Sequence, residues 1–394
     1  MIAAWVLGGV YALIGTLCVV ELGTSMPEAG GWYVYSRHVF GRYAGFLIGW
    51  CDWVMQSAAL AYLSIAIGEF AVALFPAIPG GVSATGVFSL MVFAFIQWRG
   101  LRSSSRTQEI TSLAKGIALL AFVAACFLLS PARETTVSVA LPSGFSLAAA
   151  FILALQSVII AYDGWYTAIY FTEEDKDPAR NLPPSAIGGV LATIAIYLLV
   201  NIGLLAVLPV GRIAGLDLPA ADVAQVLFGG LSGKIITALS LIMMLSVVNA
   251  VLLLATRILY GLSRDHLFFP QLARVTEAGT PLPAMLLTTC VSMALVLSGT
   301  FEKLIAMVAF FVVFVYSSGF LALLVLRKRE PDRVRPFKVW GYPWTPLIAL
   351  AGSIAFLVGN IVSDPRNSLH GTILIALNVP VFLLVRRYQA SKRT

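Results

Sequence analysis

Charged residues are scarce in this chain, making up 11% of 394 residues against 59% that are hydrophobic. A soluble protein of this length needs far more charge to cover its surface, so the composition excludes that class. Cysteines are also few, and none shows a paired spacing. Cys18, Cys51, Cys126 and Cys290 all lie in apolar runs, which indicates neither a disulfide framework nor a zinc site.

Catalytic motifs are equally sparse. The three histidines, His38, His266 and His370, are far apart in sequence and leave metal catalysis without a ligand cluster. No Ser/His/Asp set, P-loop or Gly-rich dinucleotide turn stands out, so we expect no enzyme, no cofactor and no nucleotide-driven pump. The net charge of +7 is explained by basic loops facing anionic lipid, and no basic stripe interleaved with aromatics points to nucleic acid.

What the chain does contain is a series of long apolar runs, most of them near the roughly 20 residues that a bilayer's hydrocarbon core requires. Eleven such runs are predicted to be membrane-spanning helices, at about 2 to 20, 43 to 75, 84 to 98, 112 to 130, 145 to 171, 186 to 209, 232 to 256, 283 to 299, 303 to 326, 344 to 363 and 371 to 385. The composition therefore predicts an all-α polytopic membrane protein.

The positions of Lys and Arg test that count, because these residues accumulate in cytoplasmic loops. When the loops are numbered alternately, 21 of the positive residues fall in one set and five in the other. The five are Arg133, Arg212, Lys234, Lys303 and Arg366. The partition places the C-terminus, including a short tail at 387–394, in the cytoplasm of a cell whose plasma membrane holds the protein.

With eleven spans, the same rule places Met1 outside, directly before the first apolar run. A cleaved signal peptide explains residues 2 to 20 poorly, because the charged leading region is absent and no convincing cleavage site follows. We therefore expect that a preceding helix is missing. The alternative is a genuine eleven-helix protein with an outside N-terminus.

The best candidate for a site is Tyr162-Asp163-Gly164-Trp165, which lies inside the fifth run. A carboxylate in such a stretch is costly unless something compensates it, and Gly164 loosens the backbone where a helix former is expected. The pattern predicts a helix that is broken near the middle of the membrane.

The run Ala161-Tyr-Asp-Gly-Trp-Tyr-Thr-Ala-Ile-Tyr-Phe-Thr-Glu-Glu174 resembles the sixth helix of the amino acid-polyamine-organocation (APC) superfamily, especially its L-type amino acid transporter branch. Pro27-Glu-Ala-Gly-Gly-Trp-Tyr-Val-Tyr35 resembles the loop after that family's second helix. Arg257-Ile-Leu-Tyr-Gly-Leu-Ser-Arg-Asp265 resembles its eighth helix, and Arg335-Pro-Phe-Lys-Val-Trp-Gly-Tyr-Pro343 the approach to its eleventh. These motifs, in order, cover nearly the whole chain.

The resemblance implies one transporter domain over 1–394, with an inverted-repeat (LeuT-like) bundle whose usual twelve helices include two repeats of five. Residues 2 to 20 then match the second helix, and the first has no counterpart here. The family's alternating access implies that its second, sixth and seventh helices move against a scaffold of the third, fourth, eighth and ninth.

The resemblance also implies a substrate site. The carbonyls of Ile160, Ala161 and Asp163 would face the ammonium group of an amino acid, while Gly164 permits the break. Many relatives have an aromatic gate at the position of Ile160, so that gate is either formed by Tyr162 or Trp165 or built from a smaller side chain. The alternatives are that Asp163 only caps the lower half of the helix and that Trp165 only packs.

Two further groups are assigned by the same resemblance. Lys115 matches a fifth-helix lysine whose ammonium stands where sodium sits in sodium-coupled relatives, which makes proton coupling possible. Its alternative is a lysine that extends to the cytoplasmic headgroups. Glu174 and Arg180 are expected to pair across the inward mouth, although their acidic cluster is also typical of a solvated loop.

Polar residues in other spans are weaker candidates. Gln56, Ser57, Ser246 and Asn249 either line the pocket or form hydrogen bonds between helices, and Asp52 is expected to pair within the bundle. The ninth run is nearly all apolar where it passes the site, and no acid beyond Asp163 is available for a cationic side chain. Neutral amino acids are therefore the expected substrates of a permease or exchanger. The alternative is a truncated, transport-incompetent membrane protein or a binding subunit.

Overall fold

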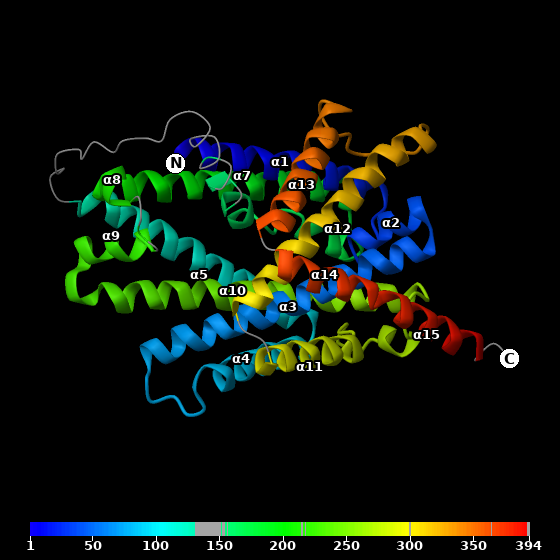
Figure 1. Cartoon of the computed structure of the whole chain (residues 1–394), viewed down its shortest axis with the longest axis horizontal. Coiled ribbons are helices and arrows are strands. Elements are labelled where there is room, and N and C mark those ends of the chain that lie inside the picture. Colours follow the sequence, from blue (N-terminus) through cyan, green and yellow to red (C-terminus); the bar gives the residue numbers. More distant parts are fainter. Residues whose placement is uncertain are drawn as a thin grey trace.

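The computed structural model describes residues 1–130, 151, 154, 155, 157–213, 216, 218–298, 301–363 and 365–391. Across these residues the regular elements are helices, which run mostly lengthwise through the molecule (Figure 1). They are α1 (Ile2–Ser25), α2 (Trp32–Phe40), α3 (Arg42–Leu74), α4 (Gly81–Trp98), α5 (Leu101–Leu128), η1 (Thr167–Glu174), α7 (Pro178–Val207), α8 (Val210–Ile213), α9 (Pro219–Phe228), η2 (Gly229–Leu231), α10 (Ser232–Arg264), η3 (Pro270–Ala273), α11 (Leu282–Ser298), α12 (Phe301–Arg329), α13 (Trp344–Ser363), α14 (Pro365–Ala376) and α15 (Asn378–Ser391).

These helices bear out the prediction of an all-α polytopic membrane protein. Eight segments among the described residues are long and apolar enough to cross a membrane, and two shorter apolar helices, Leu282–Ser298 and Trp344–Gly359, accompany them. α3 has 33 residues, so it is about 50 Å long, and it fits a bilayer only when tilted. α7 is capped by Asp177, whose carboxylate accepts a hydrogen bond from the N–H of Arg180, and Pro178 occupies its first turn. Both residues are typical of a helix start.

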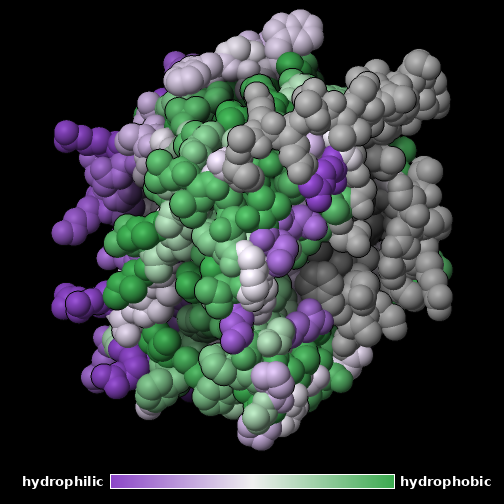
Figure 2. Space-filling model, turned by 90° about the vertical axis from the view of Figure 1, so that its left-hand side faces the viewer, coloured by the Kyte–Doolittle hydropathy of each residue, from purple (hydrophilic) through white to green (hydrophobic). Residues whose placement is uncertain are grey.

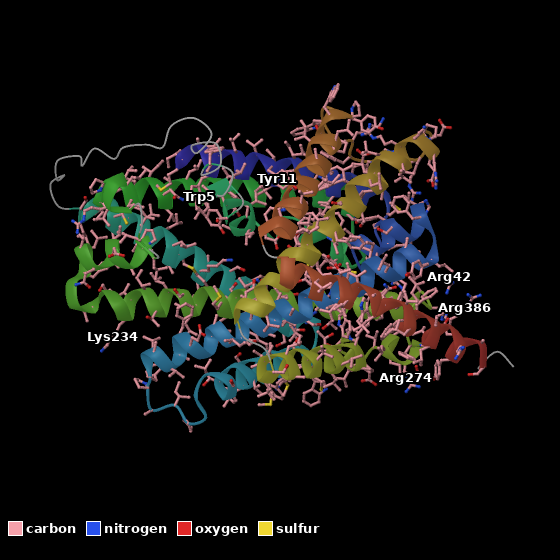
Figure 3. The ribbon with its side chains drawn as sticks, in the orientation of Figure 1. Trp5, Tyr11, Arg42, Lys234, Arg274 and Arg386 are labelled. Carbon is pink, nitrogen blue, oxygen red and sulfur yellow. The ribbon has the colours of Figure 1, made fainter. Side chains whose placement is uncertain are left out.

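The basic residues separate in space as they do in sequence. Arg42, Arg274 and Arg386 lie toward the end of the molecule that carries the C-terminus, whereas Lys234 lies toward the opposite end, where α8 and α9 are (Figure 1 and Figure 3). Seen from that opposite end, much of the surface is hydrophobic, with a few polar patches (Figure 2). These four residues therefore lie toward opposite ends according to their loop set, while the side of the membrane that each end faces stays a prediction.

The predicted break in the fifth run is confirmed. Residues 157–161 are helical, residues 162–166 form successive turns, and η1 continues the chain as a 3-10 helix. Gly164 has a φ of +105°, a conformation that side-chain-bearing residues rarely adopt. The chain can therefore leave helical geometry beside Asp163 because this position is a glycine.

The turn segment packs against α1 through a close contact at Gly15. A Cβ atom added there would lie 2.7 Å from the ring of Trp165, which is itself 8% exposed. Trp165 also contacts the rings of Trp32, Tyr316 and Phe320, at centroid distances of 6.2, 5.1 and 6.2 Å. A tryptophan thus holds the broken helix between α1 and α12.

We expect Gly15→Val to destabilise the protein by about 1 to 3 kcal/mol, because the added carbons overlap the ring of Trp165. Thermal unfolding of the purified protein in detergent measures the effect. Gly188→Val is the matched control, since that helical glycine in α7 has open space around it. Equal melting temperatures for the two variants would mean that Trp165 is not held as described.

Candidate functional site

A cavity of about 800 Å³ adjoins the broken helix. Its walls come from the turn segment and from α3, α5, α7, α10 and α12, with Ala12 of α1 at one edge. Among the described residues that line it, Asp163 and Lys115 are the charged ones. The wall therefore carries one negative and one positive side chain, and the rest is uncharged.

The turn segment forms most of one wall. Ile160, Tyr162, Asp163, Gly164 and Trp165 all line the cavity. The side chain of Ile160 is 48% exposed and Tyr162 is 4% exposed, so the smaller residue is the more accessible of the two. Five of the six candidates drawn from this segment thus meet at the cavity.

The carbonyl groups of this segment already have partners in part. Ile160 accepts a hydrogen bond from the N–H of Asp163 at 3.1 Å, and Ala161 accepts one from the hydroxyl of Tyr197 at 3.1 Å. Among the described residues, no hydrogen bond ends on the carbonyl of Asp163. A ligand could therefore bond directly to the carbonyl oxygen of Asp163. At the carbonyls of Ile160 and Ala161 it would share or displace the present donors.

The side chain of Asp163 has a partner on α12. The hydroxyl of Tyr316 donates a hydrogen bond to its carboxylate, and Tyr316 is 4% exposed. The ring of Tyr316 also lies 4.9 Å from that of Tyr166, whose hydroxyl accepts a bond from Gln56 at 3.1 Å. A row of polar groups therefore joins Asp163 to α3 through buried tyrosines.

Tyr316 was not a sequence candidate, although it interrupts the apolar ninth run that passes the site. It extends the contacts of Asp163 beyond its own helix. The carboxylate is bonded across the bundle to α12, and its contact with a substrate stays a prediction.

Of the four weaker candidates, two line the cavity and two do not. Gln56 and Ser246 belong to the wall, and Ser246 lies 3.5 Å from Ser112 of α5. Ser57 is fully buried and donates to the backbone of Trp53 within α3. Asn249 donates to Gln108 of α5 at 2.9 Å and accepts from Gln97 of α4, so it joins three helices instead of lining the cavity.

Lys115 lines the cavity from α5, beside Ser112 and Gly116. It is partly buried, and no hydrogen bond or ion pair within the described chain engages its ammonium group. The predicted location is thus consistent with a cavity lysine, while its coupling role stays a prediction. Asp52, also expected to pair within the bundle, accepts a hydrogen bond from Tyr170 at 2.7 Å.

The ion pair predicted at the inward mouth needs a correction. Glu174 pairs with Arg257 of α10, with Nε–Oε1 and Nη2–Oε2 distances of 2.6 and 3.0 Å. Arg180 is exposed, and its backbone N–H bonds to Asp177 at the start of α7. The two residues are six apart in sequence, but the 3-10 geometry of η1 directs Glu174 toward α10 instead.

A second ion pair strengthens the same junction. Arg264 donates to both oxygens of Glu173, at 2.6 and 2.7 Å, and the N–H of Ala29 donates to the same carboxylate at 2.7 Å. Burial raises the pKa of Glu173, but the bonds from Arg264 and Ala29 outweigh it and leave that pKa below its ordinary value. η1 is therefore tied to the end of α10 and to the loop before α2.

These pairs lie immediately beyond the cavity. Thr167 and Ala168 line it at the start of η1, and Leu254 lines it three residues before Arg257. Glu173 and Glu174 thus join η1 to α10 a few residues beyond the lining of the cavity. The arrangement is a helix bundle with a large internal cavity, a broken helix beside it and ion pairs at its mouth, which defines a polytopic membrane transport protein.

Comparison with known proteins identifies the kind of transporter. The family model described as amino acid permease matches residues 1–385. The serine/threonine exchanger SteT of Bacillus subtilis is 29% identical over 98% of this chain and 89% of its own length. Asc-type amino acid transporter 1 of Homo sapiens is 29% identical over 96% of this chain and 74% of its own. Large neutral amino acids transporter small subunit 2 of Homo sapiens is 27% identical over 96% and 72%.

The chain belongs to the amino acid permease family of the APC superfamily. Its relatives are transporters and exchangers of amino acids, not enzymes. The resemblance drawn from the sequence motifs is thereby confirmed over nearly the whole chain.

Proposed function

We propose that this permease moves neutral amino acids by alternating access and that its substrate binds at the break beside Gly164. The observation that carries the proposal is the turn segment at the wall of the 800 Å³ cavity, with Asp163 and Lys115 as the charged residues described there. A wall with one charge of each sign suits a zwitterion whose side chain is neutral. A cationic substrate would leave its second positive charge without a partner.

The polar groups at the break have separate roles in this proposal. The free carbonyl of Asp163 and the shared carbonyls of Ile160 and Ala161 accept hydrogen bonds from the substrate ammonium. The carboxylate of Asp163 adds a negative charge close to that ammonium. The names of two relatives also describe neutral substrates, one serine and threonine and the other large neutral amino acids.

Lys115 is proposed as the coupling residue. Its ammonium group faces the same cavity as Asp163 but comes from α5. Binding and release of a proton by this amine would accompany transport. We also propose that the ion pair of Glu174 and Arg257 closes the cytoplasmic mouth of the cavity. The protein as a whole is proposed to lie in the plasma membrane, surrounded by lipid.

Uptake by purified protein in lipid vesicles tests the function. We expect labelled serine, threonine, alanine or leucine to enter, and lysine or arginine to compete at least tenfold less well. Lys115→Met is expected to lower uptake at least tenfold, whereas Lys234→Met, at an exposed lysine outside the cavity lining, leaves it unchanged. Uptake of no amino acid, or equal competition by arginine, would contradict the proposal.

A further inference from the structure

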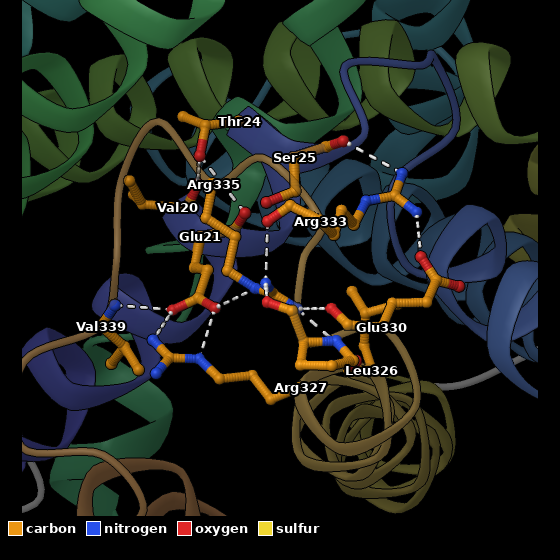
Figure 4. Close-up of polar contacts among 11 residues, drawn as sticks. Val20, Glu21, Thr24, Ser25, Leu326, Arg327, Glu330, Arg333, Arg335 and Val339 are labelled. Atoms are coloured by element: carbon orange, nitrogen blue, oxygen red, sulfur yellow. Dashed lines mark hydrogen bonds and ion pairs between the residues drawn. The ribbon is translucent and has the colours of Figure 1, made fainter.

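A buried carboxylate joins the C-terminal ends of α1 and α12. Glu21 is 1% exposed, and Arg327 donates to it through Nε at 2.7 Å and through Nη2 at 2.5 Å. The backbone N–H of Val339 donates to the same carboxylate at 2.6 Å, and Nε of Arg335 lies 3.3 Å from it (Figure 4). The end of α1 therefore meets the end of α12 and the loop that follows it, more than 300 residues later, at one charge.

The loop after α12 is folded around this cluster. Arg335 donates to the carbonyls of Glu330, Pro331 and Arg333 at 2.7, 3.0 and 2.9 Å. The guanidinium of Arg327 also lies over the ring of Tyr342, 4.2 Å from its centroid. The two arginines thus fix both the end of α12 and the loop that leads to α13.

The Glu21 cluster and the pair at the cavity mouth differ in access to water. Separating Glu21 from Arg327 and Arg335 would leave a buried charge without a partner, which is strongly unfavourable. The side chain of Glu174 is 34% exposed, so water can solvate its carboxylate when the pair opens. Arg257 is 6% exposed, but its guanidinium also donates to the carbonyl of Leu253 at 2.9 Å and keeps that bond without Glu174. A contact that must open and close in each transport cycle is therefore suited to the partly exposed position of Glu174 and not to the buried position of Glu21.

Resting on the proposed function, we propose that the Glu21 cluster stays closed throughout transport and is the pivot about which α1 turns. Gly15, which contacts Trp165, is six residues before Glu21, and α12 packs along α3 and α13. When α1 rotates about its fixed C-terminal end, Gly15 and the part of α1 that packs against Trp165 move, while the end of α12 stays in place. The pair of Glu174 and Arg257, in contrast, opens.

Two engineered cysteine pairs distinguish a pivot from a gate. In a background with the four native cysteines replaced by alanine, Ser25→Cys and Arg333→Cys form the Glu21 pair, which leaves Glu21, Arg327 and Arg335 in place; Arg333 donates to the carbonyl of Ser25 at 3.2 Å. Glu174→Cys and Arg257→Cys form the Glu174 pair in the control protein. A short bifunctional maleimide links each pair in vesicles. Uptake of labelled serine is expected to keep at least half its unlinked value in the first protein and to fall at least tenfold in the second. Loss of uptake on linking the first pair would overturn the proposal.

Linking rates provide a second measurement that needs no turnover. Saturating serine is expected to leave the rate at the Glu21 pair unchanged within twofold and to change the rate at the Glu174 pair more than threefold. A substrate-dependent rate at the Glu21 pair contradicts the pivot even when the double substitution stops transport. Failure of the proposed function is recognised separately, because the wild-type protein would then take up no amino acid.

Discussion

Gly164→Pro is expected to abolish uptake of neutral amino acids, and Gly164→Ala to lower it at least tenfold. The φ of +105° is closed to proline and costs other residues about 1 to 3 kcal/mol. Apart from its chain neighbours, no atom of the described residues lies within 4 Å of a Cβ added at this position, so the effect acts through the backbone and not through a steric clash. Since 1.4 kcal/mol corresponds to a factor of ten, the strain alone accounts for the alanine result.

Gly188→Ala provides the control for this pair of variants. Gly188 is also free of neighbours within 4 Å, but it lies in α7 with ordinary helical geometry. Its substitution is expected to leave uptake unchanged and to stabilise the helix slightly. If Gly164→Ala and Gly188→Ala transported equally well, the break would not be part of the substrate site.

Asp163→Leu is expected to raise the KM for serine at least tenfold. The substitution removes the negative charge from the cavity wall and leaves the hydroxyl of buried Tyr316 without its acceptor, which costs about 1 to 3 kcal/mol. Tyr316→Phe removes the same bond but keeps the charge, so a smaller rise in KM is expected. Initial uptake rates over a range of serine concentrations measure both effects.

Glu109→Gln is the control for charge in general, because Glu109 is exposed on α5 and outside the cavity. Its KM is expected to equal that of the wild type. An unchanged KM in Asp163→Leu, with normal amounts of protein in the vesicles, would show that the carboxylate does not contact the substrate. If the KM of Tyr316→Phe rose as much as that of Asp163→Leu, the hydrogen bond from Tyr316 and not the negative charge would be what substrate binding requires.

The sequence predicts those features that depend on local chemistry. An acid and a glycine side by side in an apolar run indicate a broken helix, and the structure has the break at that place. Run length locates most of the long helices, although α5 and α7 begin at Leu101 and Pro178, well before their apolar runs, and the last run is divided between α14 and α15. Each of these signals lies within a few turns of one helix, so no tertiary contact is needed to interpret it.

Pairings between distant residues could not be predicted in the same way. Glu174 and Arg257 are 83 residues apart, and the nearer Arg180 was the expected partner. Ser57 follows Gln56 directly, but neighbouring residues in a helix point about 100° apart, so only Gln56 faces the cavity. Glu21 lies just beyond the predicted first run, and its partners on α12 and the following loop are more than 300 residues away.

The most direct test of the central claim is protection of the break by substrate. Ile160→Cys, in a background without native cysteines, places a thiol at an exposed position of the cavity wall. Its reaction with a small maleimide is expected to slow at least fivefold in saturating serine and to be unaffected by the same concentration of arginine. An equal rate with and without serine, in protein that still transports it, would contradict a substrate site at this broken helix.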